Sequence, residues 1–177
     1  MRYPVPGEFD VTALYAALDA QRLARGLSWR QVADSMWAQS AVLNARRHDH
    51  PISPSTLTGM RSRGATSCQH ALFMLRWLGR VPEDFVPGAP RVMGNALPDA
   101  GPDRRLRWNL ARLHGALDAA RREKGLTWAA AARELHCTPS QLTGLRTARF
   151  AIGIGPAMRI VGWLGRPTAD FIDAARW

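Results

Sequence analysis

Lysine is almost absent from this chain, and cysteine is rare. Of the 24 basic residues only Lys124 is a lysine, and the 177 residues include two cysteines, Cys68 and Cys137. Two cysteines at unmatched positions exclude a disulfide framework and are typical of an intracellular protein. No apolar run approaches the ~20 residues that cross a bilayer, and residues 1–8 lack the apolar core of a signal peptide. We expect a cytoplasmic protein with no membrane partner.

Catalytic motifs are also missing. The sequence has no Gly-x-Ser-x-Gly motif, no glycine-rich phosphate loop and no cluster of paired carboxylates. We therefore expect neither an enzyme nor a bound cofactor. His48, His50, Cys68 and His70 suggest a metal, but their spacing matches no common structural zinc pattern, and we expect no metal site.

Positive charge is abundant. The net charge is +10, and the residues after position 90 hold 14 basic and 7 acidic side chains, against 10 and 7 before it. A strong positive field favours an anionic partner such as nucleic acid or a membrane surface. The bias towards arginine carries less weight, because a GC-rich genome encodes arginine by default.

The chain repeats itself once. Residues 14–29 recur as 113–128, residues 54–61 as 139–146, and residues 77–80 as 163–166, in the same order. A long repeat present only twice indicates a duplicated small domain rather than a solenoid. We place the first domain at 1–86 and the second at 103–177. Residues 87–102 read as a linker because they hold four prolines and three glycines.

Each copy predicts five short helices. The first is capped by Asp10 and ends at Gly26, and its counterpart runs from about Asp103 to Lys124. Hydroxyl caps predict the next two starts, at Ser28 and Ser53-Pro54 in one copy and at Thr127 and Thr138-Pro139 in the other. The fourth helices end at Gly79 and Gly165, and the short fifth helices follow Pro82 and Pro167.

An insertion interrupts the first copy only. Seventeen residues separate Met36 from Pro54, whereas three separate Leu135 from Pro139. The extra segment, 37–50, carries Arg46, Arg47, His48, Asp49 and His50. We expect a flexible basic loop there, or an arm that touches the DNA backbone or a partner.

The tight turn before the third helix and the sequence Thr-Pro-Ser-Gln-Leu-Thr that opens it resemble the Cro-type family of lambda-repressor-like (XRE) helix-turn-helix domains. The resemblance covers about residues 10–86 and 104–173, and it implies an all-α fold of two tandem five-helix domains. It also implies that each third helix lies in the major groove of double-stranded DNA. The positions that the family would use are Pro54, Ser55, Thr56, Thr58, Gly59, Arg61 and Arg63, then Thr138, Pro139, Ser140, Gln141, Thr143, Gly144, Arg146 and Arg149.

Most side chains at these positions are small, which departs from the family. Small residues cannot form the bidentate base contacts that give ~1–3 kcal/mol of discrimination, and only Gln141 is able to bracket an adenine. The arginines are interpreted as phosphate clamps, or as a solvated basic helix end. Gly59 and Gly144 favour either a close approach to the duplex or a tight contact between helices.

Trp29 and Trp128 open the second helices, where the family often has a glutamine facing a phosphate. An indole N–H can donate to that phosphate, but packing that seals the second helix is the favoured interpretation.

These observations favour a DNA-binding transcriptional regulator with phosphate-dominated contacts, associated with the nucleoid. The alternative is a protein-interaction or scaffolding module that keeps the helical fold without reading DNA. Pairing is expected through a homodimer or an intrachain pseudo-dimer, in which one chain bridges adjacent major grooves. The competing geometry packs the two units with their third helices pointing apart.

Overall fold

Side-chain caps set most of the helix starts in the computed structural model of this protein, which describes residues 7–50, 52–89, 96–147 and 152–176. Asp10 accepts a hydrogen bond from the backbone of Ala13 and starts α1 (Val11–Ala24). Ser28 and Gln31 form a capping box at α2 (Trp29–Ala38), and Ser53 caps α4 (Pro54–Arg63). Ser67 caps α5 (Cys68–Leu78), which ends at Gly79 and is followed by the 3-10 helix η1 (Pro82–Phe85).

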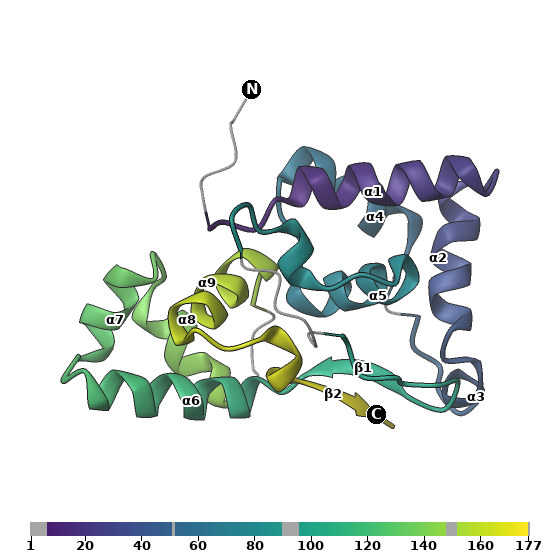
Figure 1. The fold of residues 1–177 in the computed structure, drawn as a ribbon. Helices are drawn as coiled ribbons and strands as arrows, with labels where there is room; N and C mark the ends of the chain where they lie inside the picture. The colour runs from purple at the N-terminus through teal and green to yellow at the C-terminus, as the bar shows by residue number, and fades with distance from the viewer. Residues whose placement is uncertain (1–6, 51, 90–95, 148–151, 177) are drawn as a thin grey trace.

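The second half repeats this order (Figure 1). Asn109 caps α6 (Leu110–Glu123) and Thr127 caps α7 (Trp128–Glu134). Thr138 and Gln141 form the capping box of α8 (Pro139–Gly144), which continues as the 3-10 helix η2 (Leu145–Thr147). The last helices are α9 (Ile154–Leu164) and η3 (Thr168–Phe171).

A small antiparallel sheet corrects the expectation of an all-α fold. Strand β1 (Arg105–Trp108) pairs with β2 (Ile172–Ala175), with Leu106 opposite Ala174. The helix expected from about Asp103 was therefore placed too early, because residues 105–108 are extended and α6 begins at Leu110. The described fold is mainly helical.

The first part of the insertion is packed: residues 37–44 are helical or lie in the turn between two helices, whereas residues 45–50 have no helix or strand, as expected of a loop. Residues 37 and 38 complete α2, and residues 41–44 form a short helix, α3 (Ala41–Asn44). The backbone N–H groups of Val42 and Leu43 donate to the carbonyl of Pro102. The end of the expected linker is held in the same way, because the Arg76 guanidinium donates to the Gly101 carbonyl at 2.6 Å.

The two halves meet at matched residues. Ser67 and Gly153, the N-caps of α5 and α9, form an antiparallel bridge. The N–H of Cys68 donates to Ile152 O and the N–H of Ile154 donates to Thr66 O, both at 2.9 Å. Such reciprocal bonds between equivalent positions indicate a local twofold axis between the halves. Buried side chains from both halves form one continuous core around it.

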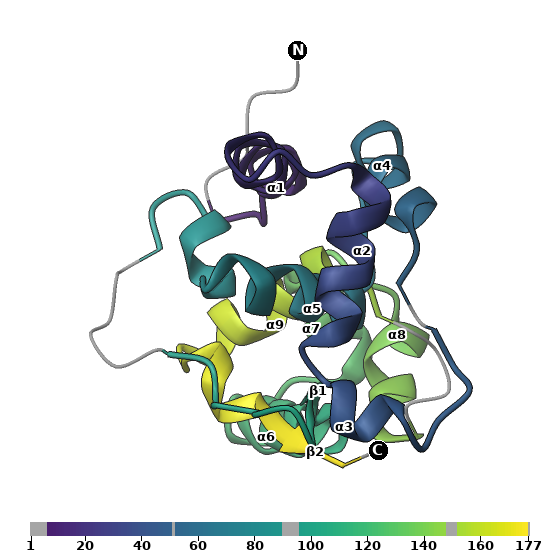
Figure 2. The same ribbon diagram turned by 90° about the vertical axis from the view of Figure 1, so that its right-hand side faces the viewer.

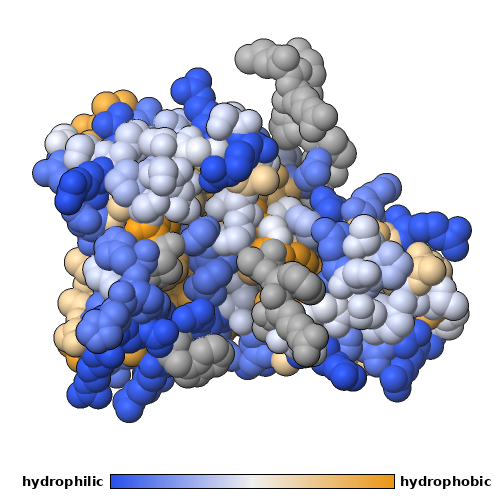
Figure 3. Space-filling view, turned by 180° about the vertical axis from the view of Figure 1, so that it is seen from behind, coloured by the Kyte–Doolittle hydropathy of each residue, from blue (hydrophilic) through white to orange (hydrophobic). Residues whose placement is uncertain are grey.

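Helices α4 and α8 lie on the same side of the molecule. Figure 2 places both on its right-hand side, with α5 and α9 nearer the centre and the teal segment of η1 on the left. Both third helices are thus found on one side of the described structure, as the pseudo-dimer expectation requires. Figure 3 views this face directly, and blue and white residues cover most of it.

Candidate functional site

The first turns of α4 and α8 form the candidate site. Pro54, Ser55 and Thr58 are exposed on α4, and Thr56 and Gly59 are half-buried. On the second half Thr138, Pro139, Ser140, Gln141 and Thr143 are exposed, and Gly144 is half-buried. The inner side of each helix is anchored by Leu57 or Leu142, both fully buried. The repeat therefore presents two equivalent polar surfaces on one face.

The hydroxyl protons of two threonines on these surfaces are used within the helices. Thr58 Oγ1 donates to Pro54 O and Thr143 Oγ1 donates to Pro139 O, each at 3.1 Å. Each threonine can still accept a hydrogen bond through its oxygen. A partner bound at this surface would therefore meet these hydroxyls only as hydrogen-bond acceptors, beside the apolar threonine methyl groups.

Gln141 is partly occupied as well. Its Oε1 accepts from the backbone N–H of Thr138 at 2.8 Å, and Thr138 Oγ1 accepts from the backbone of Gln141. A bidentate contact with adenine needs both ends of the amide. Gln141 would therefore have to leave its capping role to bracket a base.

The space that a side chain would fill at Gly59 is occupied by Arg63 rather than by a neighbouring helix. The three heavy atoms nearest to a Cβ built at Gly59 all belong to the Arg63 side chain, with Nη1 at 2.5 Å. The hypothesis of a tight contact between helices is thus not supported at this position. The guanidinium of Arg63 lies back along α4 instead.

Aromatic stacks hold the start of each second helix. Trp29 stacks on Tyr15 at 5.3 Å between ring centroids, and Trp128 stacks on His114 at 5.2 Å. Arginines cover the same tryptophans, Arg22 at 5.0 Å and Arg121 at 4.6 Å. Both tryptophans are half-buried, so the packing interpretation accounts for their position.

The stack connects to the arginines of the candidate site. Arg61 lies 5.6 Å over the Tyr15 ring, and its exposed counterpart Arg146 acts electrostatically on His114. Burial lowers the pKa of His114 below 6.5, and Arg146 and Arg121 lower it further, against the opposing effect of Asp118. The imidazole is therefore neutral near pH 7. Arg63 is also exposed, whereas Arg149 lies outside the described residues.

Sequence reasoning missed a buried arginine that holds the insertion. Arg105 is 1% exposed and donates to Asp49 Oδ2 at 3.0 Å and to Asn44 Oδ1 at 2.8 Å. Its guanidinium also lies 4.7 Å over the ring of Trp37. The hydrogen bond from Arg105 holds the pKa of the Asp49 carboxyl well below its usual range, aided by Arg47 and opposed by burial. No local signal reveals this cluster, because Arg105 is far from its partners in sequence.

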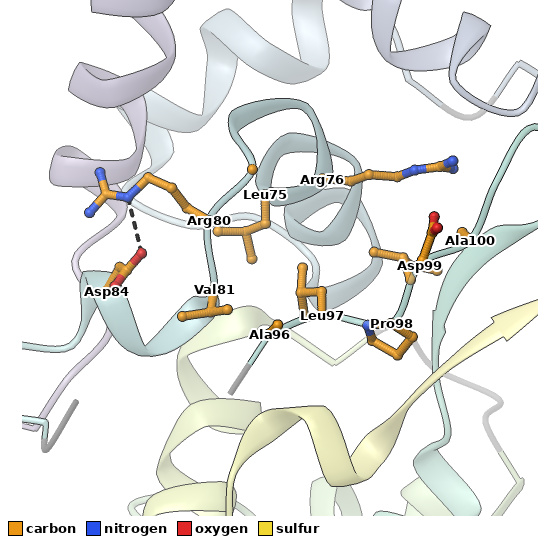
Figure 4. A pocket seen from close by; sticks show the side chains of 12 residues that line it. Leu75, Arg76, Arg80, Val81, Asp84, Ala96, Leu97, Pro98, Asp99 and Ala100 are labelled. Carbon is orange, nitrogen blue, oxygen red and sulfur yellow. Dashed lines mark hydrogen bonds and ion pairs between the residues drawn. The ribbon is translucent and has the colours of Figure 1, made fainter. Parts of the chain in front are cut away.

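A shallow pocket of about 370 Å³ lies beneath residues 96–100 (Figure 4). Leu75, Val81 and Leu97 line it together with ionised groups that already have partners, such as Arg80, which donates to Asp84 at 3.1 Å. The pocket thus presents apolar surface and few free polar groups.

The suggested metal ligands are not gathered into a cluster. His50 stacks on Trp37 with ring centroids 4.5 Å apart, while Cys68 is buried in the core. Burial raises the pKa of the Cys68 thiol to about 12, which opposes the thiolate form that binds metals. Within residues 7–50, 52–89, 96–147 and 152–176, no three His, Cys, Asp or Glu side chains are grouped to hold an ion.

No helix in the described ranges is long and apolar enough to cross a membrane. Comparisons with known protein families, with characterised proteins and with solved structures find no match to this chain.

Proposed function

We propose that this protein binds double-stranded DNA and regulates transcription, with each half acting as a lambda-repressor-like helix-turn-helix domain. The contacts are mainly to phosphates. One chain supplies both reading helices, so that it acts as its own pseudo-dimer.

The observation that carries the proposal is the placement of α4 and α8. Both expose their N-terminal residues on one side of the molecule, and the Ser67–Gly153 bridge relates them by local twofold symmetry. A two-fold pair of reading helices suits two half-sites one helical turn apart, ~34 Å. Two helices on one face can engage one side of a duplex together.

Charge supports a phosphate-dominated mode of binding. The net charge is +10, and Arg61, Arg63 and Arg146 are exposed on or directly after α4 and α8. Direct reading is weak, because the hydroxyls of Thr58 and Thr143 donate to their own helices and Gln141 caps α8. Such a protein obtains most of its affinity from counterion release.

A mobility-shift assay on random-sequence duplex at several salt concentrations tests the proposal. We expect a complex at low salt whose affinity falls with a log–log slope near ~0.9 per phosphate contacted. Absence of any complex at low salt would contradict DNA binding.

The alternative function is a protein-interaction module. The back-bonded hydroxyls and the apolar pocket beside Leu75 and Leu97 favour it, since neither feature contributes to binding DNA. The same assay separates the two functions, because an interaction module gives no salt-dependent complex with duplex DNA.

A further inference from the structure

The segment 45–50 stands on the same side of the molecule as the two candidate reading helices. Figure 2 shows the chain between α3 and α4 looping out on the right-hand side, where α4 and α8 also lie. Seen from behind, a strongly hydrophilic area covers this region at the lower left of Figure 3. The second half has no equivalent, because only three residues separate Leu135 from Pro139.

The segment is held in place from inside. Asp49 accepts both Nη groups of Arg105, at 3.0 and 3.3 Å, and it also accepts from Arg47 Nε at 2.9 Å. Asn44 connects the guanidinium of Arg105 to α2. The Oδ1 of Asn44 accepts from Arg105, and the Nδ2 of Asn44 donates to the carbonyl of Trp37 at 2.6 Å. His50 stacks on Trp37. We call this group of side chains, Trp37, Asn44, Asp49, His50 and Arg105, the latch.

The outer side of the segment carries two side chains that have no partner among the described residues. Arg46 and His48 are exposed, and neither side chain forms an ion pair or a hydrogen bond with a described residue. Arg46 and Arg47 line a hollow of about 430 Å³ together with Arg176, and the only carboxylate in its lining is Asp103. A fixed backbone that presents an unpaired arginine beside other arginines suits an anionic group such as a phosphate.

We propose that segment 45–50 is a third contact to the DNA backbone, which Arg46 makes outside the two half-sites and on one side only. The inference rests on the proposed function and extends it. Because segment 45–50 has no counterpart in the second half, the complex has a direction, although the two candidate reading helices are nearly symmetric. The chain then makes one backbone contact that has no counterpart on the other side of the local twofold axis.

Hydroxyl-radical footprinting and a salt titration on one labelled duplex test whether Arg46 makes this third contact. We expect Arg46→Gln to reduce the log–log salt slope by ~0.9, the value for one phosphate contact, and to remove protection on one flank only. Arg80→Gln is the charge control, because it removes the same charge from the turn between α5 and η1, a segment that Figure 2 shows on the opposite side of the molecule, where Arg80 pairs with Asp84. It should leave the slope and both flanks as in the wild type.

Asp49→Asn separates a positioned contact from simple charge. Removal of this carboxylate raises the net charge, so a purely electrostatic effect strengthens binding and keeps the footprint. The latch predicts the opposite on one flank, where protection is reduced because asparagine offers one acceptor oxygen in place of the two that accept from Arg105.

Three results would overturn the inference. An unchanged slope and footprint for Arg46→Gln would contradict the third contact while leaving DNA binding intact. Equal loss of protection on both flanks would contradict its one-sidedness. If the wild-type chain forms no complex with the duplex, the proposed function fails, and this inference fails with it.

Discussion

At the scale of single residues, Gly59 separates a structural role from a role in DNA binding. A Cβ there meets only the flexible guanidinium end of Arg63 among its three nearest atoms. Alanine is favoured over glycine in a helix by up to about 1 kcal/mol. We expect Gly59→Ala to raise the free energy of unfolding by up to this amount, measured by urea titration, because Arg63 can move away.

The Gly59→Ala variant also tests how closely α4 approaches DNA. If glycine is present so that α4 approaches DNA closely, Gly59→Ala weakens binding in the mobility-shift assay while the protein remains stable. A variant that is less stable than the wild type would contradict this account, because a neighbour other than Arg63 would then have to be displaced.

His114 makes stability depend on pH. Burial, with the help of Arg146 and Arg121, lowers its pKa in the folded state, whereas an unfolded histidine titrates near ~6.5. Protons therefore bind the unfolded chain more readily. The stability that depends on neutral His114 is complete above this ordinary value and is lost as the pH falls through it towards the lower pKa of the folded state.

His114→Tyr removes the pH-dependent contribution of this histidine to stability. Tyrosine suits the position because Tyr15 stacks on tryptophan at the matched position of the first half. Urea unfolding at about pH 7.5 and about pH 5.5, on either side of the ordinary histidine value, measures the effect. We expect the wild type to lose more stability on acidification than the variant. An equal loss in both proteins would show that His114 does not titrate differently on folding.

Among the helices, the matched arginines Arg61 and Arg146 rank the two candidate DNA-binding elements, α4 and α8. The second half carries the larger positive excess, a short turn and Gln141. We expect Arg146→Ala to weaken duplex binding more than Arg61→Ala. A phosphate contact contributes more affinity in the half of the chain with the larger positive potential. Mobility shifts of both variants, with circular dichroism to establish folding, make the comparison. Equal or reversed effects would contradict the ranking.

Helix starts were predictable because their signals are local. Asp10, Ser28, Ser53, Thr127 and Thr138 each cap a helix that begins at the next residue. The sheet was not predictable, because β1 has four residues and its partner β2 lies at the other end of the second half. The latch was hidden for the same reason, since Arg105 and Asp49 pair across a long sequence separation. The candidate residues on α4 and α8 could be predicted, but the internal use of their hydroxyls could not.

At the scale of the whole molecule, the continuous core predicts that the two halves unfold together. Trp108 is buried at the join, and its Nε1 donates to Cys68 O at 3.0 Å. Leu142→Ala, at a fully buried position of the second half, should destabilise the protein by ~2–5 kcal/mol. We expect one transition that shifts as a unit, with coincident fluorescence and circular dichroism curves. A separate transition that keeps the wild-type midpoint would show that the first half folds alone.

We propose that one chain binds one duplex through two matched helices, α4 and α8. The length of duplex that one chain needs for full binding tests this directly. A duplex of about 22 base pairs holds two half-sites one helical turn apart, whereas one of about 11 holds only one. Anisotropy titrations at several salt concentrations give the stoichiometry and the salt slope for each duplex. We expect one chain per longer duplex, with a salt slope about twice that on the shorter one, because both helices then contact phosphates. Two chains on the longer duplex, or equal slopes on both, would contradict it.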